Sequence, residues 1–526
     1  MTLSSAYTLS SILAQTAARF PDKEALVFRE QRITWGRLER WVTNLAGAFL
    51  EMGVQPGDRV GILCSTRPEY IVAYLAATRI GAIATGFNMQ YTPREVGDLA
   101  RLTQPAVMVV LDQKGSFLRH RPVLEGLPFL RHLLVIGQKT PPGTRSFHAL
   151  VEQERPELSA ALAQGEAAVT PDQGALIVFT GGTTGVPKAA LLTHRNIVSN
   201  IQAQVRHLGF RSEDRIVLHL PMNHVSGATL MTVSALMTGA TLVILERFHP
   251  AHTLALVAQE RVTVLGQVPT MFIMEFQLPD LAAYDLSSLR MVIVAGAPTP
   301  PPVMARIVDL APVAVHGYGL TEVGGMVTYT RPGEGLDALL AGAGPVAEEF
   351  QLRIVDQERR SLAPGQVGEI AIRGECVMAG YWGNPEETAL VRDEEGWLYT
   401  GDLGKLAPDG SVTIVGRRKE MILTGGFNVY PWEIEQYVLT HPDVAQAACI
   451  GVPDPVMGEV GHLFVVAKPG AELDPRAIRR FCKAGLARYK VPRQVRVRDS
   501  LPLTPVGKVD KRRLREEQRI ATLELW

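Results

Sequence analysis

Cysteine is scarce in this chain, and the few cysteines stand far apart. The 526 residues contain four, at Cys64, Cys376, Cys449 and Cys482, and none forms a C-x-x-C pair. Disulfide frameworks and structural zinc sites need clustered cysteines, so neither is expected. Isolated cysteines usually serve as small buried hydrophobic residues. Their isolation also favours a reducing compartment such as the cytoplasm.

Long apolar runs and an excess of either charge are also missing. No stretch of about 18 uncharged apolar residues occurs, so no membrane-spanning helix is expected. Lysine plus arginine and aspartate plus glutamate number 53 each, so nothing indicates nucleic acid or an anionic membrane as a partner. Residues 1–11 lack basic side chains and a long apolar run, which argues against a signal or transit peptide. Self-association as a homodimer stays open.

Short, mostly apolar segments alternate with longer amphipathic stretches over the first part of the chain. Leu9–Arg19 and Thr34–Met52 carry apolar residues at helical spacing. The apolar segments between such stretches are typical of strands buried on both faces of a sheet. They are Arg59–Cys64, Ala106–Leu111, Ala175–Thr180, Thr241–Glu246, Val262–Val268 and Met291–Ala295. The alternation predicts a large layered α/β domain.

The pattern changes near residue 340, where shorter segments alternate apolar and polar side chains. Gln351–Asp356 and Gly368–Gly374 read as such strands, and Asp409-Gly410 is a strong hairpin signal between two more. We therefore expect a β-rich subdomain over about 341–415.

The chain divides into two expected domains. Residues 1–415 form the N-terminal domain, 416–419 (Gly-Arg-Arg-Lys) a charged connector, and 420–526 a small C-terminal domain. The last part has its own strands, such as Ala445–Val452 and His462–Ala467, and its own helical stretches. This mixture predicts an α+β fold for the C-terminal domain.

A segment rich in glycine and threonine, Thr180–Lys188, follows one of the buried runs and precedes a helical stretch near His194. Glycines let several backbone N–H groups point at one anion, while the hydroxyls and the lysine add donors and positive charge. The segment predicts a phosphate-binding loop, with a flexible turn as the alternative. It is not a Walker loop, because the G-K-S/T ending is missing. The expected phosphate contacts are Thr180, Gly181, Gly182, Thr183, Thr184, Gly185 and Lys188.

Five segments, in order, resemble the motifs of the adenylate-forming superfamily, which includes acyl- and aryl-CoA synthetases, adenylation domains of peptide synthetases, and luciferases. The resemblance runs from Leu9 to about Arg515. The segments are Thr180–Lys188, His316–Glu322, Tyr399–Asp402, Gly416–Lys419 with Gly425–Asn428, and Leu501–Lys511.

The resemblance implies a nucleotide site for ATP and AMP. Tyr318 would offer a flat face for adenine, and Asp402 would accept hydrogen bonds from the ribose hydroxyls. Arg417 would reach the ribose or a phosphate. The further residues implied are Gly296, Ala297, Pro298, His316, Gly317, Gly319, Leu320, Thr321 and Lys508.

The resemblance also implies roles in catalysis. Lys508 would stabilise negative charge as the carboxylate attacks the α-phosphate and pyrophosphate leaves. Glu322, with Thr184, would hold Mg²⁺, which prefers one or two carboxylates plus phosphate oxygens. Lys419 stands at the position of a hinge about which the small C-terminal domain is mobile, and Gly425 and Gly426 would line the path of coenzyme A.

His224 resembles the residue that borders the acyl pocket in many acyl- and aryl-CoA ligases. The small or apolar residues expected to line the pocket with it are Val225, Gly227, Ala228, Thr270, Val294 and Gly319. No aspartate stands near His224 to meet a substrate ammonium, and a buried ammonium without a partner is costly, so an α-amino acid is disfavoured.

The sequence therefore predicts an ATP-dependent carboxylate–CoA ligase that forms an acyl adenylate and then an acyl-CoA. A medium- or long-chain fatty acid is the preferred substrate, and an aryl or alicyclic carboxylic acid is the alternative. A luciferase-like oxidase and a nucleotide-binding protein without catalytic turnover are further alternative functions. Lys508, Glu322 and Asp402 are all present, which argues against the last of these.

Overall fold

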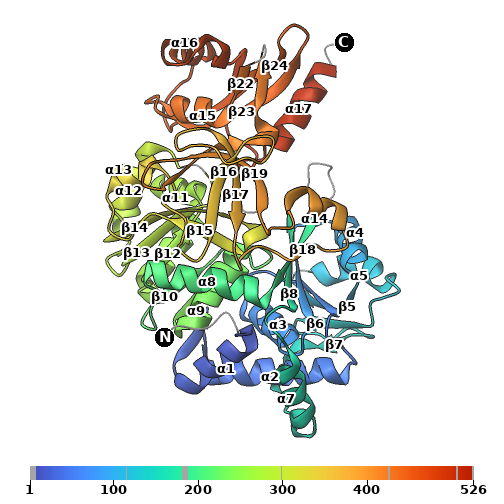
Figure 1. Cartoon of the computed structure of the whole chain (residues 1–526). Coiled ribbons are helices and arrows are strands. Elements are labelled where there is room, and N and C mark those ends of the chain that lie inside the picture. The colour runs from blue at the N-terminus through green and yellow to red at the C-terminus, as the bar shows by residue number, and fades with distance from the viewer. Residues whose placement is uncertain are drawn as a thin grey trace.

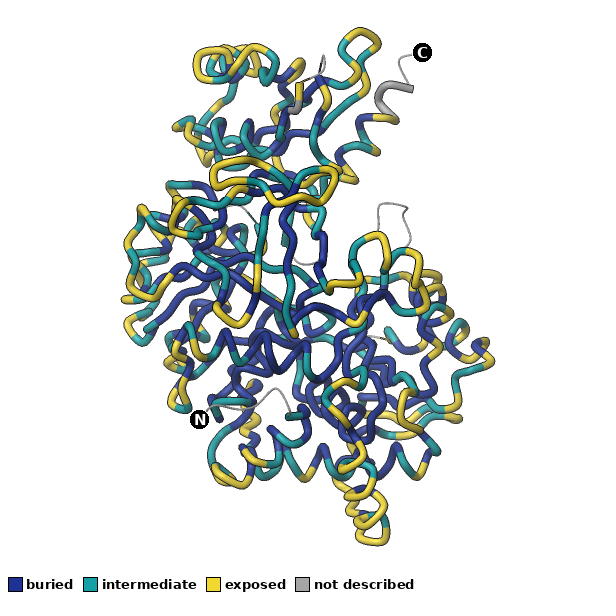
Figure 2. The backbone as a smooth tube through the Cα atoms, in the orientation of Figure 1, coloured by how far each residue is buried: buried dark blue, intermediate teal, exposed yellow. Residues whose placement is uncertain are grey.

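The computed structural model describes residues 7–113, 115–180, 187–297, 299–424, 427–504 and 507–523. Within these residues the chain forms four sheets, two of eight strands, one of four and one of five (Figure 1). The two largest sheets and their helices form the lower part of the molecule, and the orange and red C-terminal elements sit above them. Buried backbone, dark blue in Figure 2, follows the strands of the lower part.

Helices cover both large sheets and the C-terminal sheet. The helices of the first half are α1 (Leu9–Arg19), α2 (Trp35–Glu51), α3 (Pro68–Arg79), α4 (Pro93–Thr103), α5 (Ser116–Glu125), α6 (Phe147–Glu152), α7 (Ser159–Ala168), α8 (His194–Leu208) and α9 (Thr232–Thr238). Those of the second half are α10 (Pro250–Glu260), α11 (Pro269–Phe276), α12 (Pro301–Val308), α13 (Leu336–Ala341), α14 (Pro385–Val391), α15 (Pro431–Leu439), α16 (Pro475–Gly485) and α17 (Lys511–Leu523). No helix in the described part of the chain is long and apolar enough to cross a membrane.

The first eight-stranded sheet has the order β15-β14-β13-β12-β10-β11-β1-β2. Its inner pairs are parallel, whereas the outermost strands β2 and β15 run antiparallel to their neighbours. The strands are β1 (Glu24–Phe28), β2 (Gln31–Thr34), β10 (Arg215–Leu218), β11 (Thr241–Ile244), β12 (Val264–Gln267), β13 (Met291–Ala295), β14 (Val313–Leu320) and β15 (Gly325–Tyr329).

Successive residues of these strands enter two different hydrophobic clusters. Val264 and Ile293 belong to the large cluster shared with α8 and α9, whereas Leu265 and Val292 belong to a second cluster with α10, α11 and α12. Side chains alternate between the faces of a sheet, so each cluster covers one face. This explains why the strands read as continuous apolar runs.

The second eight-stranded sheet has the order β18-β9-β8-β4-β3-β5-β6-β7. At one edge, β8 and β9 form an antiparallel pair, and β18 adds to β9. The strands are β3 (Arg59–Leu63), β4 (Ile83–Phe87), β5 (Pro105–Leu111), β6 (His132–Ile136), β7 (Arg145–Ser146), β8 (Gly174–Thr180), β9 (Lys188–Thr193) and β18 (Gly380–Tyr381).

Helix α8 shows how the local sequence sets a boundary next to the site. The hydroxyl of Thr193 accepts a hydrogen bond from the Asn196 N–H, and the Asn196 side chain accepts one from the Thr193 N–H. This reciprocal cap fixes the start of the helix. At the other end Gly209 adopts φ 64°, a conformation that glycine allows at low cost.

The four-stranded sheet has the order β16-β17-β19-β20 and is antiparallel throughout. Its strands are β16 (Gln351–Val355), β17 (Gly368–Arg373), β19 (Leu398–Leu406) and β20 (Val412–Arg417). The predicted hairpin is present between β19 and β20, where Gly410 has φ 83°.

The C-terminal sheet has the order β22-β21-β24-β23, with β25 pairing along β24. Its strands are β21 (Ile422–Thr424), β22 (Phe427–Val429), β23 (Val444–Asp454), β24 (Gly458–Ala467) and β25 (Gln494–Arg498). Helices α15 and α16 pack in one cluster, and Leu514 of α17 packs in another. This small helix-covered sheet beside a large α/β domain confirms the predicted fold class.

A buried polar group lies on the face of the first sheet that α11 covers. Glu275 of α11 is 1% exposed, and one of its oxygens accepts a hydrogen bond of 2.7 Å from the Gln267 side chain. Burial raises the pKa of Glu275 from 4.5 to about 8, against the opposing effect of the Gln267 hydrogen bond. Glu275 is therefore neutral when the folded chain is at neutral pH.

We expect Glu275→Gln to reduce the loss of stability at alkaline pH. The pKa is higher in the folded chain, so the folded state binds an extra proton between pH 4.5 and about 8. Stability is consequently lost as the pH rises through this range, and glutamine removes that titration. Calorimetric melting temperatures at acid, neutral and alkaline pH would measure the effect. Glu394→Gln, at an exposed position, is the control, and parallel curves for all three proteins would contradict the expectation.

Candidate nucleotide and acyl site

The two ends of the predicted phosphate-binding loop lie at the tip of the β8–β9 pair. These ends, Thr180 and Lys188, are directly opposite each other in the register. The chain after Lys188 continues as β9 before α8 begins at His194, so a strand separates loop and helix. Eight predicted site residues lie outside the described residues, namely Gly181, Gly182, Thr183, Thr184, Gly185, Pro298, Gly425 and Gly426.

Lys188 lies among acidic and aromatic side chains. Its ammonium forms an ion pair with the Glu387 carboxylate and lies 4.9 Å from the ring centre of Tyr381. The Tyr381 hydroxyl donates a hydrogen bond of 2.9 Å to Glu322. The structure therefore brings Lys188 and Glu322 together through Tyr381. Glu387 and Tyr381 were not anticipated from the sequence, because only the pairing of β18 with β9 places them here.

Tyr318, Asp402 and Arg417 form a second connected group. The Tyr318 hydroxyl donates to one oxygen of Asp402 at 2.8 Å, and Arg417 Nε contacts the other oxygen at 2.8 Å. Asp402 and Arg417 are paired across β19 and β20. The carboxylate is 5% exposed and raises the pKa of the Arg417 guanidinium. Side chains from two other motifs, Tyr318 and Arg417, thus share the Asp402 carboxylate.

The remaining residues of the β14 motif have different surroundings. His316 Nδ1 lies 3.0 Å from the carbonyl oxygen of Leu339 and 3.1 Å from that of Gly342, so the imidazole holds α13 against the sheet. A Cβ atom at Gly319 would lie 1.9 Å from the Gly325 carbonyl oxygen, so only glycine fits there. Gly317 precedes this close approach. Leu320 ends β14, and Thr321 begins the short helix Thr321–Val323, which carries Glu322.

Lys508 of the C-terminal domain reaches the N-terminal domain. A Cβ atom at Gly296 would lie 3.5 Å from Lys508 Cε and 3.7 Å from its Nζ, and Ala297 follows in the same loop. The neighbouring Gly507 carbonyl accepts a hydrogen bond of 2.6 Å from the Thr270 hydroxyl. Burial, together with the charge of Arg417, lowers the pKa of Lys508 to about 8, against the opposing effect of Asp402.

His224 lies within range of the Lys508 charge. Burial and the Lys508 charge lower the pKa of His224 to about 3, so the imidazole is neutral. The Ser226 N–H lies 3.2 Å from His224 Nδ1 and donates to it. A nitrogen that accepts a hydrogen bond carries no proton, so the proton of the neutral ring is on Nε2.

The predicted acyl-pocket residues do not all meet. Val225 and Ala228 pack in the large cluster beside β12 and β14, whereas Val294 packs in the second cluster on the other face. A Cβ atom at Gly227 would lie 2.5 Å from the Pro221 carbonyl oxygen, so this glycine permits a close backbone approach. The Thr270 hydroxyl is engaged with the C-terminal domain.

The predicted hinge residue Lys419 lies in the short helix Arg418–Glu420, directly after β20. Its neighbour Arg418 forms a hydrogen bond of 3.1 Å with Glu369 of β17. Lys419 itself is exposed. The connector is therefore anchored to the four-stranded sheet by Arg418 before Lys419, whereas Glu420 after it pairs with Lys511 of α17 at 3.0 Å.

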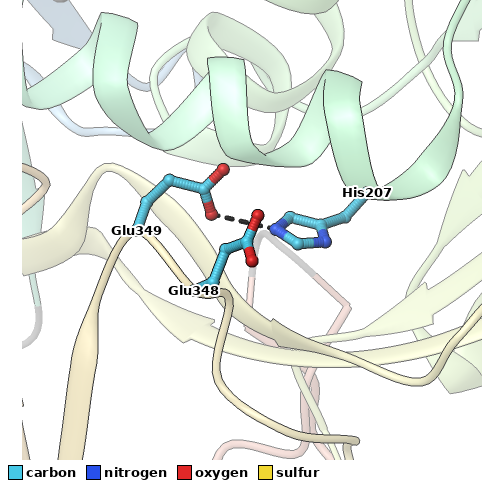
Figure 3. A group of neighbouring side chains, drawn as sticks. All are labelled: His207, Glu348 and Glu349. Carbon is cyan, nitrogen blue, oxygen red and sulfur yellow. Dashed lines mark hydrogen bonds and ion pairs between the residues drawn. The ribbon is translucent and has the colours of Figure 1, made fainter.

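One group of potential metal ligands occurs among the described residues away from Glu322. His207, Glu348 and Glu349 place their ligand atoms within 4.8 Å of one another (Figure 3). Arg206 forms ion pairs with both Glu348 and Glu349. The guanidinium already supplies the positive charge that these carboxylates attract, so the group carries no metal assignment.

Comparison with known proteins decides the family. The model of the AMP-binding enzyme family matches residues 13–382, and that of its C-terminal domain matches residues 433–508. This chain is an AMP-binding enzyme. The match confirms the resemblance to the adenylate-forming superfamily and covers both domains.

The AMP-binding enzymes most similar to the chain include ligases for three kinds of acid. A methyl-dioxo-octahydroindenyl-propanoyl:CoA ligase of Mycobacterium tuberculosis is 36% identical over 97% of this chain and 98% of its own length. A long-chain-fatty-acid–CoA ligase of Bacillus subtilis is 32% identical, covering 97% and 94%. The structure of an anthranilate CoA ligase, AuaEII, in complex with anthranoyl-AMP matches with a TM-score of 0.90 and 26% identity over 99% of both chains. The predicted acid–thiol ligase is confirmed, and these relatives divide among alicyclic, fatty and aryl acids.

Proposed function

We propose that this carboxylate–CoA ligase converts an apolar carboxylic acid, ATP and coenzyme A into acyl-CoA, AMP and pyrophosphate, with a medium- or long-chain fatty acid as the acid. The observation that carries the first step is the position of Lys508 against Gly296. The charge of Lys508 lowers the pKa of His224, and the Asp402 carboxylate acts to raise the pKa of Lys508. A cation, a neutral donor and a carboxylate from separate motifs converge on one place.

Lys508 and Asp402 have complementary roles in adenylate formation. The Lys508 ammonium stabilises the negative charge that builds on the phosphate oxygens during attack by the carboxylate. Asp402 binds the ribose hydroxyls, because a carboxylate can accept further hydrogen bonds beside those from Tyr318 and Arg417. Arg417 lies beside the same ribose site and faces the phosphates. Tyr318 stacks on adenine with a ring that its hydroxyl holds in place.

His224 orients the acid. Its neutral imidazole carries the proton on Nε2, which can donate a hydrogen bond to a carboxylate oxygen without cancelling the nucleophile's charge. Val225 and Ala228 supply apolar surface beside it. An apolar acid fits this environment better than an amino acid, since a buried ammonium would need a carboxylate partner.

Glu322 fits the requirements of a Mg²⁺ ligand. Its Oε1 accepts a hydrogen bond from Tyr381, while its Oε2 has no hydrogen-bond partner among the described residues. Bound Mg²⁺ would neutralise charge on the phosphates of ATP. Thr184 is proposed as the second contact. Lys188 faces the same phosphates from β9.

Thioester formation uses the C-terminal domain differently. We assign Lys419 as the hinge, because it follows β20 and precedes the C-terminal sheet. Rotation about this position would replace Lys508 at the acyl phosphate by the segment with Gly425 and Gly426, along which the thiol of coenzyme A enters. A hinge needs few residues that absorb a large change of φ and ψ.

Pyrophosphate release with a panel of acids tests the proposal. The panel contains short, medium and long fatty acids, benzoate-like acids and cyclohexane-type acids, each with and without coenzyme A. We expect release that depends on a medium or long fatty acid and increases with coenzyme A. Release that does not change with coenzyme A would indicate another acceptor for the acyl group. If none of the acids in the panel supported pyrophosphate release, the result would contradict the ligase reaction.

An alicyclic or aryl acid is the second candidate. The alicyclic ligase of Mycobacterium tuberculosis is more similar in sequence than the fatty-acid ligase of Bacillus subtilis, at 36% against 32% identity. Preference for the cyclohexane-type or benzoate-like acids in the panel would select this candidate.

A further inference from the structure

Lys188, the last residue of the predicted phosphate-binding loop, already has an anionic partner in this structure. Its ammonium is ion-paired with Glu387 of α14, and the two side chains are only 20% and 30% exposed. The two residues are 199 positions apart in sequence. A lysine proposed to bind phosphate is therefore held by a carboxylate of the chain itself.

Glu387 is fixed in place by its own surroundings. The Asn384 side chain accepts a hydrogen bond of 3.0 Å from the Glu387 N–H and so caps α14. The Thr388 hydroxyl donates to the Asn384 carbonyl at 2.8 Å and accepts from the Tyr381 N–H at 2.9 Å. Since Tyr381 is paired with Ala190 of β9, α14 is attached to the strand that carries Lys188.

The charge of Lys188 is already balanced by the Glu387 carboxylate. The ammonium lies over the Tyr381 ring, and the Tyr381 hydroxyl is bonded to Glu322. A phosphate group that approaches Lys188 meets the Glu387 carboxylate at the same ammonium. Two anions at one cation repel each other, and partial burial weakens the screening of this repulsion by water.

We propose that Glu387 competes with the phosphates of ATP for Lys188 and thereby lowers the affinity for ATP. The inference rests on the proposed function, in which Lys188 binds phosphate. When ATP enters, the Lys188–Glu387 pair opens and the ammonium turns to the phosphates. When pyrophosphate leaves, Glu387 pairs with Lys188 again, so the same exchange favours release of this product.

Glu387→Gln tests the competition. Calorimetric titration with ATP in the absence of acid and coenzyme A measures binding without turnover. We expect the dissociation constant for ATP to fall about three- to fivefold, the range set by a partly exposed ion pair. In steady state the KM for ATP should fall while the KM for the acid stays the same, a split that general damage to the fold does not produce. An unchanged or higher dissociation constant for ATP would overturn the inference.

Three further variants separate the inference from the proposed function. Glu386→Gln is the matched control, because Glu386 is the preceding residue of α14, exposed and without a partner among the described residues. It should leave ATP binding unchanged. In a Lys188→Ala background, Glu387→Gln should no longer strengthen binding, since the shared cation is gone. If Lys188→Ala alone left ATP binding unchanged, the role of Lys188 would fail, whereas an equal effect of Glu387→Gln in both backgrounds would overturn only the competition.

Glu387→Asp guards against a change of fold in the glutamine variant. Aspartate keeps the charge but shortens the side chain, so its effect on ATP binding should have the same sign and be smaller. Melting temperatures of all variants show whether the fold is preserved. A larger gain in affinity with aspartate than with glutamine would contradict competition through charge.

Discussion

Lys508→Ala is expected to lower the rate of acyl-adenylate formation by about 10²–10³-fold, the cost of removing one preorganised charge donor. Thioester formation from a supplied acyl adenylate should be largely spared, because this step is proposed to use the other domain arrangement. Single-turnover pyrophosphate release measures the first step, and acyl-CoA formation from synthetic adenylate measures the second. Lys483→Ala, at an exposed position of α16, is the control. Equal loss of both steps would remove Lys508 from its assigned role.

The pH dependence of the wild-type enzyme gives a second readout of Lys508. Burial and the charge of Arg417 lower its pKa to about 8. The ammonium form is the active one, so the adenylation rate should be maximal below this pH and fall as the pH rises through it. The step from supplied adenylate should lack this decline. A flat profile for adenylation up to about pH 10, the ordinary range of lysine, would contradict the assignment.

Asp402→Ala is expected to raise the dissociation constant for ATP by about ten- to a hundredfold, because hydrogen bonds to a charged group contribute about 1.5–3 kcal/mol. The structure adds a second effect. Asp402 also holds the Tyr318 hydroxyl and Arg417, so the melting temperature should fall as well. Titration with ATP and thermal unfolding measure the two effects separately.

Asp402→Asn distinguishes the two roles of the carboxylate. Asparagine keeps the size and one acceptor oxygen, so Tyr318 can retain its hydrogen bond while the charge is lost. We expect stability to recover more than ATP binding does. A variant with normal ATP affinity and a lowered melting temperature would show that Asp402 serves the fold alone.

Local patterns in the sequence were enough for many elements. Leu9–Arg19 is predicted as a helix and is α1, because its apolar residues recur at helical spacing and are buried. Asp409-Gly410 predicts the β19–β20 turn, because glycine accepts the positive φ that a tight hairpin needs. These features depend only on residues close together in the chain.

Features that depend on long-range pairing escaped prediction. Strand β9 lies between the loop and α8, and its hydrophobic residues could equally well start a helix. Glu387 reaches Lys188 only because β18 pairs with β9. From the sequence alone, a glutamate in the first turn of a helix is predicted to be an exposed charge. Val294 was predicted to line the acyl pocket, but its position in β13 directs it into the second cluster. Which face a strand residue occupies depends on neighbours that are far away in sequence.

The contact of Lys508 with Gly296 has a thermodynamic consequence. Together with the Thr270–Gly507 hydrogen bond, it joins the C-terminal domain to the loop with Gly296, which is proposed to belong to the nucleotide site. If docking of this domain strengthens ATP binding by some factor, ATP must strengthen docking by the same factor, because coupling between two equilibria is reciprocal. The nucleotide is then a ligand of the interface as much as of either domain. Its consumption changes the relative populations of the domain arrangements without any separate signal.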